Sequence, residues 1–220
     1  MVTALPALSS VTASEFSSSH ASTYSSFKRL LDLLGSLVGL VVLAIVFVPI
    51  ALLIKLDSPG PILYSQQRYG LLGKPFTIYK FRSMVVNADT LKEQVANEAN
   101  GLIFKNENDP RLTRVGMFLR RSSLDEFPQF WNVLVGEMSL VGTRPPTADE
   151  VKKYQPHHWQ RLNVKPGITG EWQVHGRSTI KDFEEIVSLD LRYQSQWHPL
   201  YDLVLIAKTF HVVLFKVGAC

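Results

Sequence analysis

The sequence has little cysteine and little charge. Its single cysteine, Cys220, stands at the last position, which excludes an internal disulfide and a metal site built from several cysteines. This scarcity is typical of a protein that faces a reducing compartment. Charged residues make up 19% of the 220 residues and hydrophobic residues 46%, so wholesale disorder is excluded. The net charge of +4 is too small to indicate a nucleic-acid partner, and we expect none.

The first 27 residues have almost no charge and no hydrophobic periodicity. They contain nine Ser, three Thr and one acidic residue, Glu15, a composition typical of a disordered tail. A secretory signal begins with basic residues, whereas here none precedes Lys28. We therefore expect residues 1–27 to be a retained tail without regular structure.

A long uncharged run follows the tail. Residues 33–54 include no charged side chain. As a helix rising ~1.5 Å per residue, such a run is roughly 33 Å long, enough to cross the core of a bilayer. The alternative is a buried helix of a soluble protein, but such helices seldom run this far without a polar interruption. The pattern predicts a membrane-inserted helix over residues 28–56.

Two features of this helix argue against a simple span. Pro49 removes a backbone hydrogen bond and predicts a kink. Basic residues flank both ends and tend to stay on the cytoplasmic side, so they favour neither orientation. These residues are Lys28 and Arg29 before the run, and Lys55, Arg68, Lys74, Lys80 and Arg82 after it. A helix that enters, bends at Pro49 and leaves on the same face satisfies both features, and we expect a monotopic protein.

The remaining residues, 57–220, predict a helix-rich α+β domain. Residues 62–64 and 76–79 lie on either side of Gly70 and Gly73 and predict a small β-hairpin. Helices are predicted over residues 88–99, 114–121, 149–162, 182–193 and 203–217. The last of these places Lys208, Thr209, His211 and Lys216 on one arc, which favours an amphipathic helix at a membrane interface. A core helix with a solvated face is the alternative.

Reactive side chains are densest in residues 120–132. Ser123 followed by Glu126 matches a capping box, so a helix is predicted to begin here. Asp125 and Glu126 would then lie in its first turn, where free backbone N–H groups favour ionised carboxylates and bind phosphate oxygens. Spacing alone also fits the plainer alternative, in which these acidic residues only stabilise the helix.

Basic residues accompany the two carboxylates. Arg120 precedes them, and Arg144 follows in a rigid Gly-Thr-Arg-Pro-Pro turn that suits bidentate binding of phosphate. Carboxylates among arginines can bind Mg²⁺ together with a nucleotide diphosphate, although ordinary surface ion pairs are the alternative. Further candidates for binding phosphate are Lys80, Arg82, Lys165 and Arg177. His157 and His158 are adjacent and are expected to point apart on a helix, so no metal pair is predicted there.

Four motifs in this order resemble the bacterial sugar transferase family, the monotopic phosphoglycosyl transferases. They are KFRSM at residues 80–84, SLDEFPQ at 123–129, MSLVGTRP at 138–145 and PGITGEWQV at 166–174. The likeness covers about residues 28 to 217. Several long motifs in family order are far more specific than any one of them.

The resemblance implies transfer of a sugar-1-phosphate from a UDP-sugar to undecaprenyl phosphate, with release of UMP. It implies Mg²⁺, a covalent phosphosugar–enzyme intermediate, and a role in starting the assembly of exopolysaccharide, capsule or O-antigen. It places the protein in the bacterial inner membrane, with its active site facing the cytoplasm. By the family motifs Asp125 is the nucleophile, Glu126 helps to hold the metal and Arg144 binds phosphate. Other active-site positions of the family match Arg120, Lys80 and Asp190.

The sequence departs from the family pattern in two places. The family's re-entrant helix breaks at a Ser-Pro pair, whereas this chain has Val48-Pro49 and lacks the hydroxyl that would satisfy a freed backbone group. Larger members carry extra transmembrane helices before this core, so we expect a minimal member. Two other functions remain open, a membrane-bound nucleotide-sugar pyrophosphatase and a catalytically silent assembly scaffold. A homo-oligomer is also left open.

Overall fold

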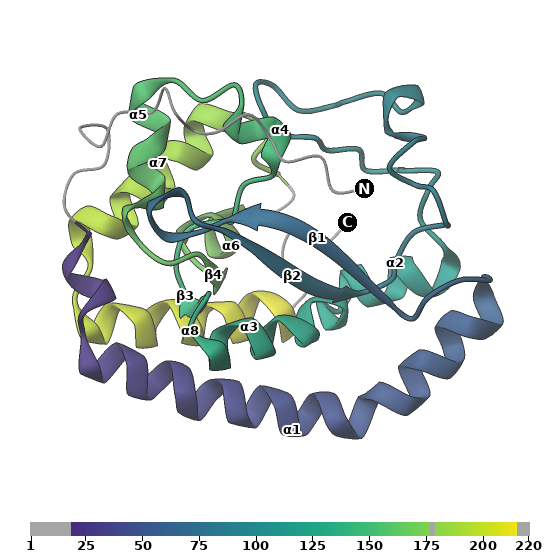
Figure 1. The fold of residues 1–220 in the computed structure, drawn as a ribbon, viewed down its shortest axis with the longest axis horizontal. Helices are drawn as coiled ribbons and strands as arrows, with labels where there is room; N and C mark the ends of the chain where they lie inside the picture. Colours follow the sequence, from purple (N-terminus) through teal and green to yellow (C-terminus); the bar gives the residue numbers. More distant parts are fainter. Residues whose placement is uncertain (1–18, 177–178, 215–220) are drawn as a thin grey trace.

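The computed structural model describes residues 19–176 and 179–214, which form a helix-rich α+β fold (Figure 1). In chain order the elements are η2 (Ala21–Thr23), α1 (Ser26–Asp57), β1 (Leu63–Tyr69), η3 (Leu71–Gly73), β2 (Pro75–Phe81), η4 (Lys92–Gln94), α2 (Arg114–Arg121), η5 (Leu124–Gln129), α3 (Phe130–Val135), β3 (Ser139–Val141), α4 (Ala148–Val151), α5 (Pro156–Trp159), η6 (Gln160–Asn163), β4 (Gly167–Thr169), α6 (Glu171–Gly176), α7 (Phe183–Gln196) and α8 (Pro199–Leu214), where η marks a 3-10 helix.

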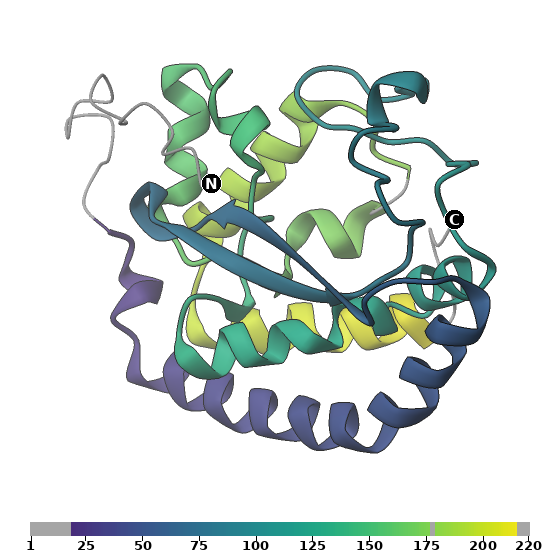
Figure 2. The same cartoon turned by 45° about the vertical axis from the view of Figure 1, so that its right-hand side comes forward.

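The elements are arranged in tiers. Helix α1 runs along one side of the molecule, and α3 and α8 lie next to it (Figure 1). The β1–β2 hairpin crosses the middle, and α4, α5 and α7 lie on the side of the hairpin away from α1. The same order is visible after a turn of 45° (Figure 2). In both views the hairpin therefore lies between α1 and the two short helices α4 and α5.

Helix α1 covers the whole predicted membrane segment. It has 32 residues, begins with Ser25 as N-cap and ends immediately before a Ser-Pro-Gly-Pro turn, whose prolines cannot continue a helix. Among the described residues it is the one helix long and apolar enough to cross a membrane. Its C-terminal part, which contains Pro49, turns towards the domain (Figure 1).

The predicted tail is shorter than expected. Residues 1–18 lie outside the described part of the chain, but residues 21–23 form η2 and α1 begins at Ser26. His20 caps η2 because its Nδ1 accepts a hydrogen bond from the Ser22 backbone N–H at 3.2 Å. For residues 21–23, 26 and 27 the prediction of a structureless tail was therefore wrong.

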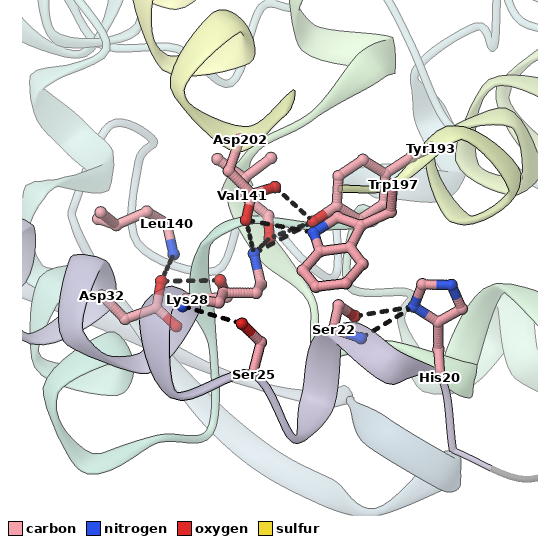
Figure 3. Close-up of polar contacts among 11 residues, drawn as sticks. His20, Ser22, Ser25, Lys28, Asp32, Leu140, Val141, Tyr193, Trp197 and Asp202 are labelled. Atoms are coloured by element: carbon pink, nitrogen blue, oxygen red, sulfur yellow. Dashed lines mark hydrogen bonds and ion pairs between the residues drawn. The ribbon is translucent and has the colours of Figure 1, made fainter. Parts of the chain in front are cut away.

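A buried lysine fastens the first turn of α1 to the domain (Figure 3). The Lys28 ammonium donates to the Asp202 carboxylate of α8 at 2.7 Å, to the Val141 carbonyl of β3 at 2.8 Å and to the Tyr193 hydroxyl of α7 at 3.1 Å. The side chains of Lys28 and Asp202 are only 6% and 1% exposed. Three acceptors surround three N–H donors, so this buried charge is both paired and fully hydrogen-bonded.

One turn further on, Asp32 extends the same attachment. Its carboxylate accepts hydrogen bonds from the Ser139 hydroxyl and the Leu140 backbone N–H, both at 2.8 Å (Figure 3). Residues four apart lie on one face of a helix, so Lys28 and Asp32 both face β3. The N-terminal end of α1 is thereby fixed to β3, α7 and α8.

The other end of α1 is also attached to the domain. Ile50 and Ile54 are buried against Phe81 of β2 and Leu119 of α2. The Asp57 carboxylate accepts a hydrogen bond from the Val115 backbone N–H at 2.9 Å. Both ends of the long apolar helix thus contact the same domain.

The predicted hairpin is confirmed, and the structure adds a second small sheet. Strands β1 and β2 pair antiparallel over their full lengths, from Leu63 opposite Phe81 to Tyr69 opposite Pro75. Strands β3 and β4 pair in parallel, although each has only three residues. A Cβ at Gly142, just after β3, would lie 2.2 Å from the Lys165 carbonyl oxygen, so only glycine allows this approach.

Two of the predicted helices, over residues 114–121 and 182–193, are confirmed as α2 and α7, and two others are wrong. Only η4 forms within residues 88–99, because the Asn97 side chain accepts hydrogen bonds from the backbone N–H groups of Ala99 and Lys105 and organises a loop. The helix predicted over residues 149–162 is divided into α4, α5 and η6. Pro156 forces Gln155 into an extended conformation with ψ 163°, so the chain between α4 and α5 cannot stay helical.

The helix predicted near the C-terminus begins four residues early, at Pro199, and residues 215–220, including Lys216, lie outside the described part. Lys208 and His211 are exposed, as the amphipathic pattern predicts. Thr209 is not on a solvated face, because its hydroxyl lies 2.6 Å from that of Thr169 in β4 and donates to the Leu205 carbonyl. This threonine therefore packs α8 onto the second sheet.

We predict that Asp202→Asn destabilises the protein by about 3–5 kcal/mol, because it leaves the buried Lys28 ammonium without its counter-charge. The double variant Lys28→Met/Asp202→Leu should recover most of this loss, since it removes both charges. Chemical denaturation in detergent micelles measures both effects, with the exposed Lys153→Met as control. Equal stability of Asp202→Asn and the parent would show that the pair does not hold α1.

Candidate active site

The two candidate carboxylates lie on η5, not in the first turn of an α-helix. Asp125 is 3% exposed and Glu126 has 21% of its side chain exposed. The predicted capping box is wrong, because Ser123 makes no side-chain cap bond and adopts φ 57°, ψ 13° in the left-handed region. Non-glycine residues rarely adopt this conformation unless their surroundings impose it, and such strain is common at functional sites.

Lys80 and Glu126 are brought together by the packing of β2 against η5. The Lys80 ammonium lies 2.8 Å from a Glu126 carboxylate oxygen. On the other side of the KFRSM motif, Arg120 donates from Nε to the Ser83 hydroxyl at 3.1 Å. The motif at residues 80–84 and the segment at residues 120–129, far apart in the sequence, therefore form one site.

Arg144 is held by a carboxylate of the next helix. Its two terminal nitrogens donate to the two oxygens of Glu150, at 2.8 and 3.0 Å. Glu150 also accepts from the Thr147 backbone N–H as part of a capping box that starts α4. Burial raises the pKa of Glu150, but the Arg144 guanidinium outweighs burial and holds the pKa below its usual range. Arg144 is therefore pre-oriented, and a phosphate would meet a guanidinium that already has a bidentate partner.

Asp190 is buried inside the domain, and its carboxylate is paired with Arg161. It is 1% exposed and accepts from Arg161 Nε at 2.7 Å. Burial raises its pKa despite the Arg161 guanidinium beside it. Arg161 in turn donates to the Arg144 carbonyl at 3.4 Å. Asp190 also accepts a hydrogen bond from the Arg144 backbone N–H, so it positions the Arg144 turn both directly and through Arg161.

The remaining candidates lie elsewhere or outside the described residues. Arg82 is buried and donates to the carbonyls of Ser58 and Pro59, where it braces the turn after α1. Lys165 lines a cavity of ≈ 450 Å³ beside the N-terminal turn of α1. Arg177 lies outside the described residues. The structure therefore joins Lys80, Arg120 and the two carboxylates, but it does not bring Arg82 or Lys165 to them.

Arg68 belongs to the site, although in the sequence it stands out only as a charge flanking the membrane helix. In the structure it lies near the end of β1, and its Nη1 donates to the Pro145 carbonyl at 2.8 Å. Arg68 also forms a β-bridge with Thr147, so the hairpin is joined directly to the Gly-Thr-Arg-Pro-Pro turn. No local motif marks this contact, because the two segments are about eighty residues apart in the chain.

The two adjacent histidines do not point apart, contrary to our expectation. Their Nε2 atoms lie 3.1 Å (His157) and 2.8 Å (His158) from the two carboxylate oxygens of Glu184 at the start of α7. His158 Nδ1 accepts the Gln155 backbone N–H, so the neutral ring carries its proton on Nε2 and donates it to Glu184. Metal binding at that Nε2 would displace the proton to Nδ1, against the Gln155 N–H. The arrangement therefore fits a link between α5 and α7 better than a metal site.

The chain belongs to the bacterial sugar transferase family, whose model matches residues 23–216. The matched region contains α1, the hairpin, η5 and the Arg144 turn. The predicted family membership is thus confirmed.

Several relatives resemble most of this chain. Galactosyl transferase CpsE of Streptococcus agalactiae is 50% identical over 194 residues, which are 87% of this chain and 43% of that protein. Undecaprenyl-phosphate galactose phosphotransferase of Salmonella typhimurium is 42% identical over 198 residues, 87% of this chain and 41% of that protein. Exopolysaccharide production protein ExoY of Rhizobium meliloti is 36% identical over 198 residues, 87% of each. This chain spans less than half the length of the first two relatives.

The link between α5 and α7 should weaken in acid. Burial lowers the pKa of His158 below its ordinary value of 6.5, and hydrogen bonds from the two histidines lower the pKa of Glu184. The folded state then binds fewer protons than the unfolded state. The stabilisation that this link contributes is therefore complete at pH values above the ordinary pKa of the two groups, and it is lost as the pH falls. We expect the unfolding temperature to drop between about pH 7 and pH 5.

Thermal unfolding of His158→Asn should show a smaller drop over the same range, since asparagine does not titrate. The exposed His211→Gln is the control and should keep the parent's pH dependence. Parallel curves for His158→Asn and the parent would show that His158 is not the titrating group.

Proposed function

We propose that this protein transfers a sugar-1-phosphate from a UDP-sugar to undecaprenyl phosphate, releases UMP, and so starts assembly of an exopolysaccharide, capsule or O-antigen. The observation that carries the proposal is the buried Asp125 next to the Glu126–Lys80 ion pair, in a chain of this family. The names of relatives support the acceptor and the pathway, since one is an undecaprenyl-phosphate phosphotransferase and another an exopolysaccharide production protein. Relatives named for galactose and for glucose favour a UDP-hexose as donor.

Asp125 is proposed as the nucleophile. One of its carboxylate oxygens attacks the phosphorus that bears the sugar, and the bond from that phosphorus to the bridging oxygen breaks, so that UMP leaves with the bridging oxygen. A phosphate oxygen of the lipid then attacks the same phosphorus and releases the carboxylate. A nucleophile of this kind divides one displacement into two, and nearby cations offset the charge of the transferring group.

Lys80 and Arg120 supply those cations. Lys80 already neutralises Glu126 at 2.8 Å, and Arg120 lies in the last turn of α2, five residues before Asp125. Arg144, fixed by Glu150, is proposed to orient a phosphate of the donor. Because these groups are anchored to β2, α2 and α4, they need little rearrangement when charge develops.

The donor set fits Mg²⁺, which prefers hard oxygen ligands from one or two carboxylates together with phosphate oxygens. Glu126 is the proposed ligand, because its carboxylate is partly exposed and belongs to the same segment as Asp125. When bound, the ion would supply charge stabilisation to the phosphates. Lys80 pairs with the same carboxylate and orients it.

We further propose that α1 enters the membrane and returns on the same face, with the active site on the cytoplasmic side of the inner membrane. Both ends of α1 contact one domain, through Lys28 and through Ile54, which a simple span with the domain on one side does not allow. An extensive apolar surface supports membrane contact. Its exposed side chains include Leu34, Val38, Val41, Ile45 and Leu52 of α1, Phe118 of α2, Trp131 of α3 and Phe210 of α8.

Asp125→Asn should lower turnover about a thousandfold or more, because the amide is a poor nucleophile. Purified protein with undecaprenyl phosphate and a panel of UDP-sugars is assayed by UMP release, and labelled sugar-phosphate bound to the protein is measured in parallel. Asp149→Asn, an exposed carboxylate of α4, is the matched control. Near-normal turnover of Asp125→Asn would refute the nucleophile, and repeated turnover without the lipid would favour a pyrophosphatase.

Glu126→Gln should raise the Mg²⁺ concentration for half-maximal activity about tenfold or more, since an amide is a weaker ligand than a carboxylate. Titration of activity with Mg²⁺ measures the effect, with the exposed Glu185→Gln as control. An unchanged Mg²⁺ requirement in Glu126→Gln would count against its role as ligand.

A further inference from the structure

Arg68 is a partly buried cation whose partners are all neutral. Its Nε and Nη2 donate to the Gln66 side-chain oxygen at 3.0 and 2.7 Å, and its Nη1 donates to the Pro145 carbonyl at 2.8 Å. Within the described residues it has no carboxylate at ion-pair distance, whereas Lys80, Arg144 and Arg161 each have one. Arginine has five N–H donors, so these three bonds leave one N–H on each terminal nitrogen.

The surroundings of Arg68 are those of the proposed active site. Burial, and next the nearby Arg144 guanidinium, lower its pKa to about 10, while Glu150 and Glu126 act in the opposite direction. Arg68 is therefore close to both the Arg144 turn and the carboxylate of η5. A cation that is desolvated beside a second cation is stabilised by a bound anion, and guanidinium groups match phosphate oxygens in geometry.

The position of Arg68 in the fold indicates which phosphate it meets. The end of β1 is joined to the Arg144 turn and to α4, which lies on the side of the hairpin away from α1 (Figure 1). Helix α1, whose exposed apolar side chains are proposed to enter the membrane, lies on the opposite side of the hairpin (Figure 1). A water-soluble ligand approaches this region more readily than a lipid phosphate.

We propose that Arg68 is a ligand for the diphosphate of the soluble nucleotide-sugar, which it binds through its two remaining N–H groups next to Arg144. The inference rests on the proposed function and adds a binding residue to it. Gln66 and Pro145 hold the guanidinium in place, so little side-chain entropy is lost when the phosphate binds. Through Pro145 the same arginine also positions the Arg144 turn.

The test uses UDP as a probe, because its binding does not require catalysis. Titration calorimetry with UDP and Mg²⁺ is carried out on the full chain in detergent for the parent, Arg68→Gln and Arg68→Lys. Lys74→Gln removes an exposed charge at the turn of the same hairpin and is the matched control. Thr147→Ala loosens the cap of α4 beside Arg68 without removing a charge.

We expect Arg68→Gln to weaken UDP binding about tenfold to a hundredfold, the range for losing charge-assisted hydrogen bonds. Arg68→Lys should lie between this variant and the parent, because it keeps the charge but not the planar group. Lys74→Gln and Thr147→Ala should bind UDP as the parent does. In a transfer assay the KM for the UDP-sugar should rise and that for undecaprenyl phosphate should not.

Parent-like UDP binding by Arg68→Gln would overturn the proposal, as would a rise confined to the KM for the lipid. An equal loss in Thr147→Ala would also overturn it, because it would assign the effect to the turn and not to the cation. If Arg68→Gln does not fold, Arg68→Lys decides by the same criterion. If UDP binding requires Arg68 but the protein shows no transfer activity, the proposed reaction is refuted and the assignment of Arg68 stands.

Discussion

The buried ion pair between Lys28 and Asp202 is the interaction on which the arrangement of the molecule depends. It joins the first turn of a long apolar helix to α8, and its other hydrogen bonds reach β3 and α7. Two charges with side chains 6% and 1% exposed are costly to bury unless each finds its partners, so only one placement of α1 satisfies them. Asp32 repeats the attachment one turn later through Ser139 and Leu140.

The attachment of α1 to the domain also fixes the position of the hairpin, and with it the residues of the proposed active site. The chain that leaves α1 enters the hairpin, and the hairpin packs β2 against η5, which places Lys80 beside Glu126. At the far end of β1, Arg68 reaches the Arg144 turn, whose arginine is fixed by Glu150. A Cβ on Gly39 of α1 would lie 2.4 Å from the Phe130 ring of α3, so the helix also packs closely against the element that continues η5. The apolar helix and the carboxylates thus belong to one connected structure.

Much of the fold was predictable from the sequence, and the features that were not predictable share one cause. The helix at 114–121, the hairpin and the apolar helix follow from local periodicity and turn residues. The parallel pairing of β3 with β4, the partners of Lys28 and the contact between Arg68 and Pro145 join segments far apart in the chain, and no local pattern encodes them. Ser123 failed as a cap because the surrounding structure imposes φ 57°, which sequence spacing does not reveal. Asp125 and Glu126 were identified from their motif, but their burial and partners required the fold.

If α1 enters and leaves the membrane on one face, both of its ends lie on the same side of the membrane as the proposed active site. With Cys220 replaced by serine, Ser26→Cys before the apolar run and Ser65→Cys after it each introduce one exposed thiol. Labelling of both variants in sealed inner-membrane vesicles of known orientation, with a maleimide that does not cross the bilayer, tests the claim directly. We expect both thiols to react when the cytoplasmic face is outside and neither to react in the opposite orientation. Reaction of the two thiols from opposite sides would contradict it.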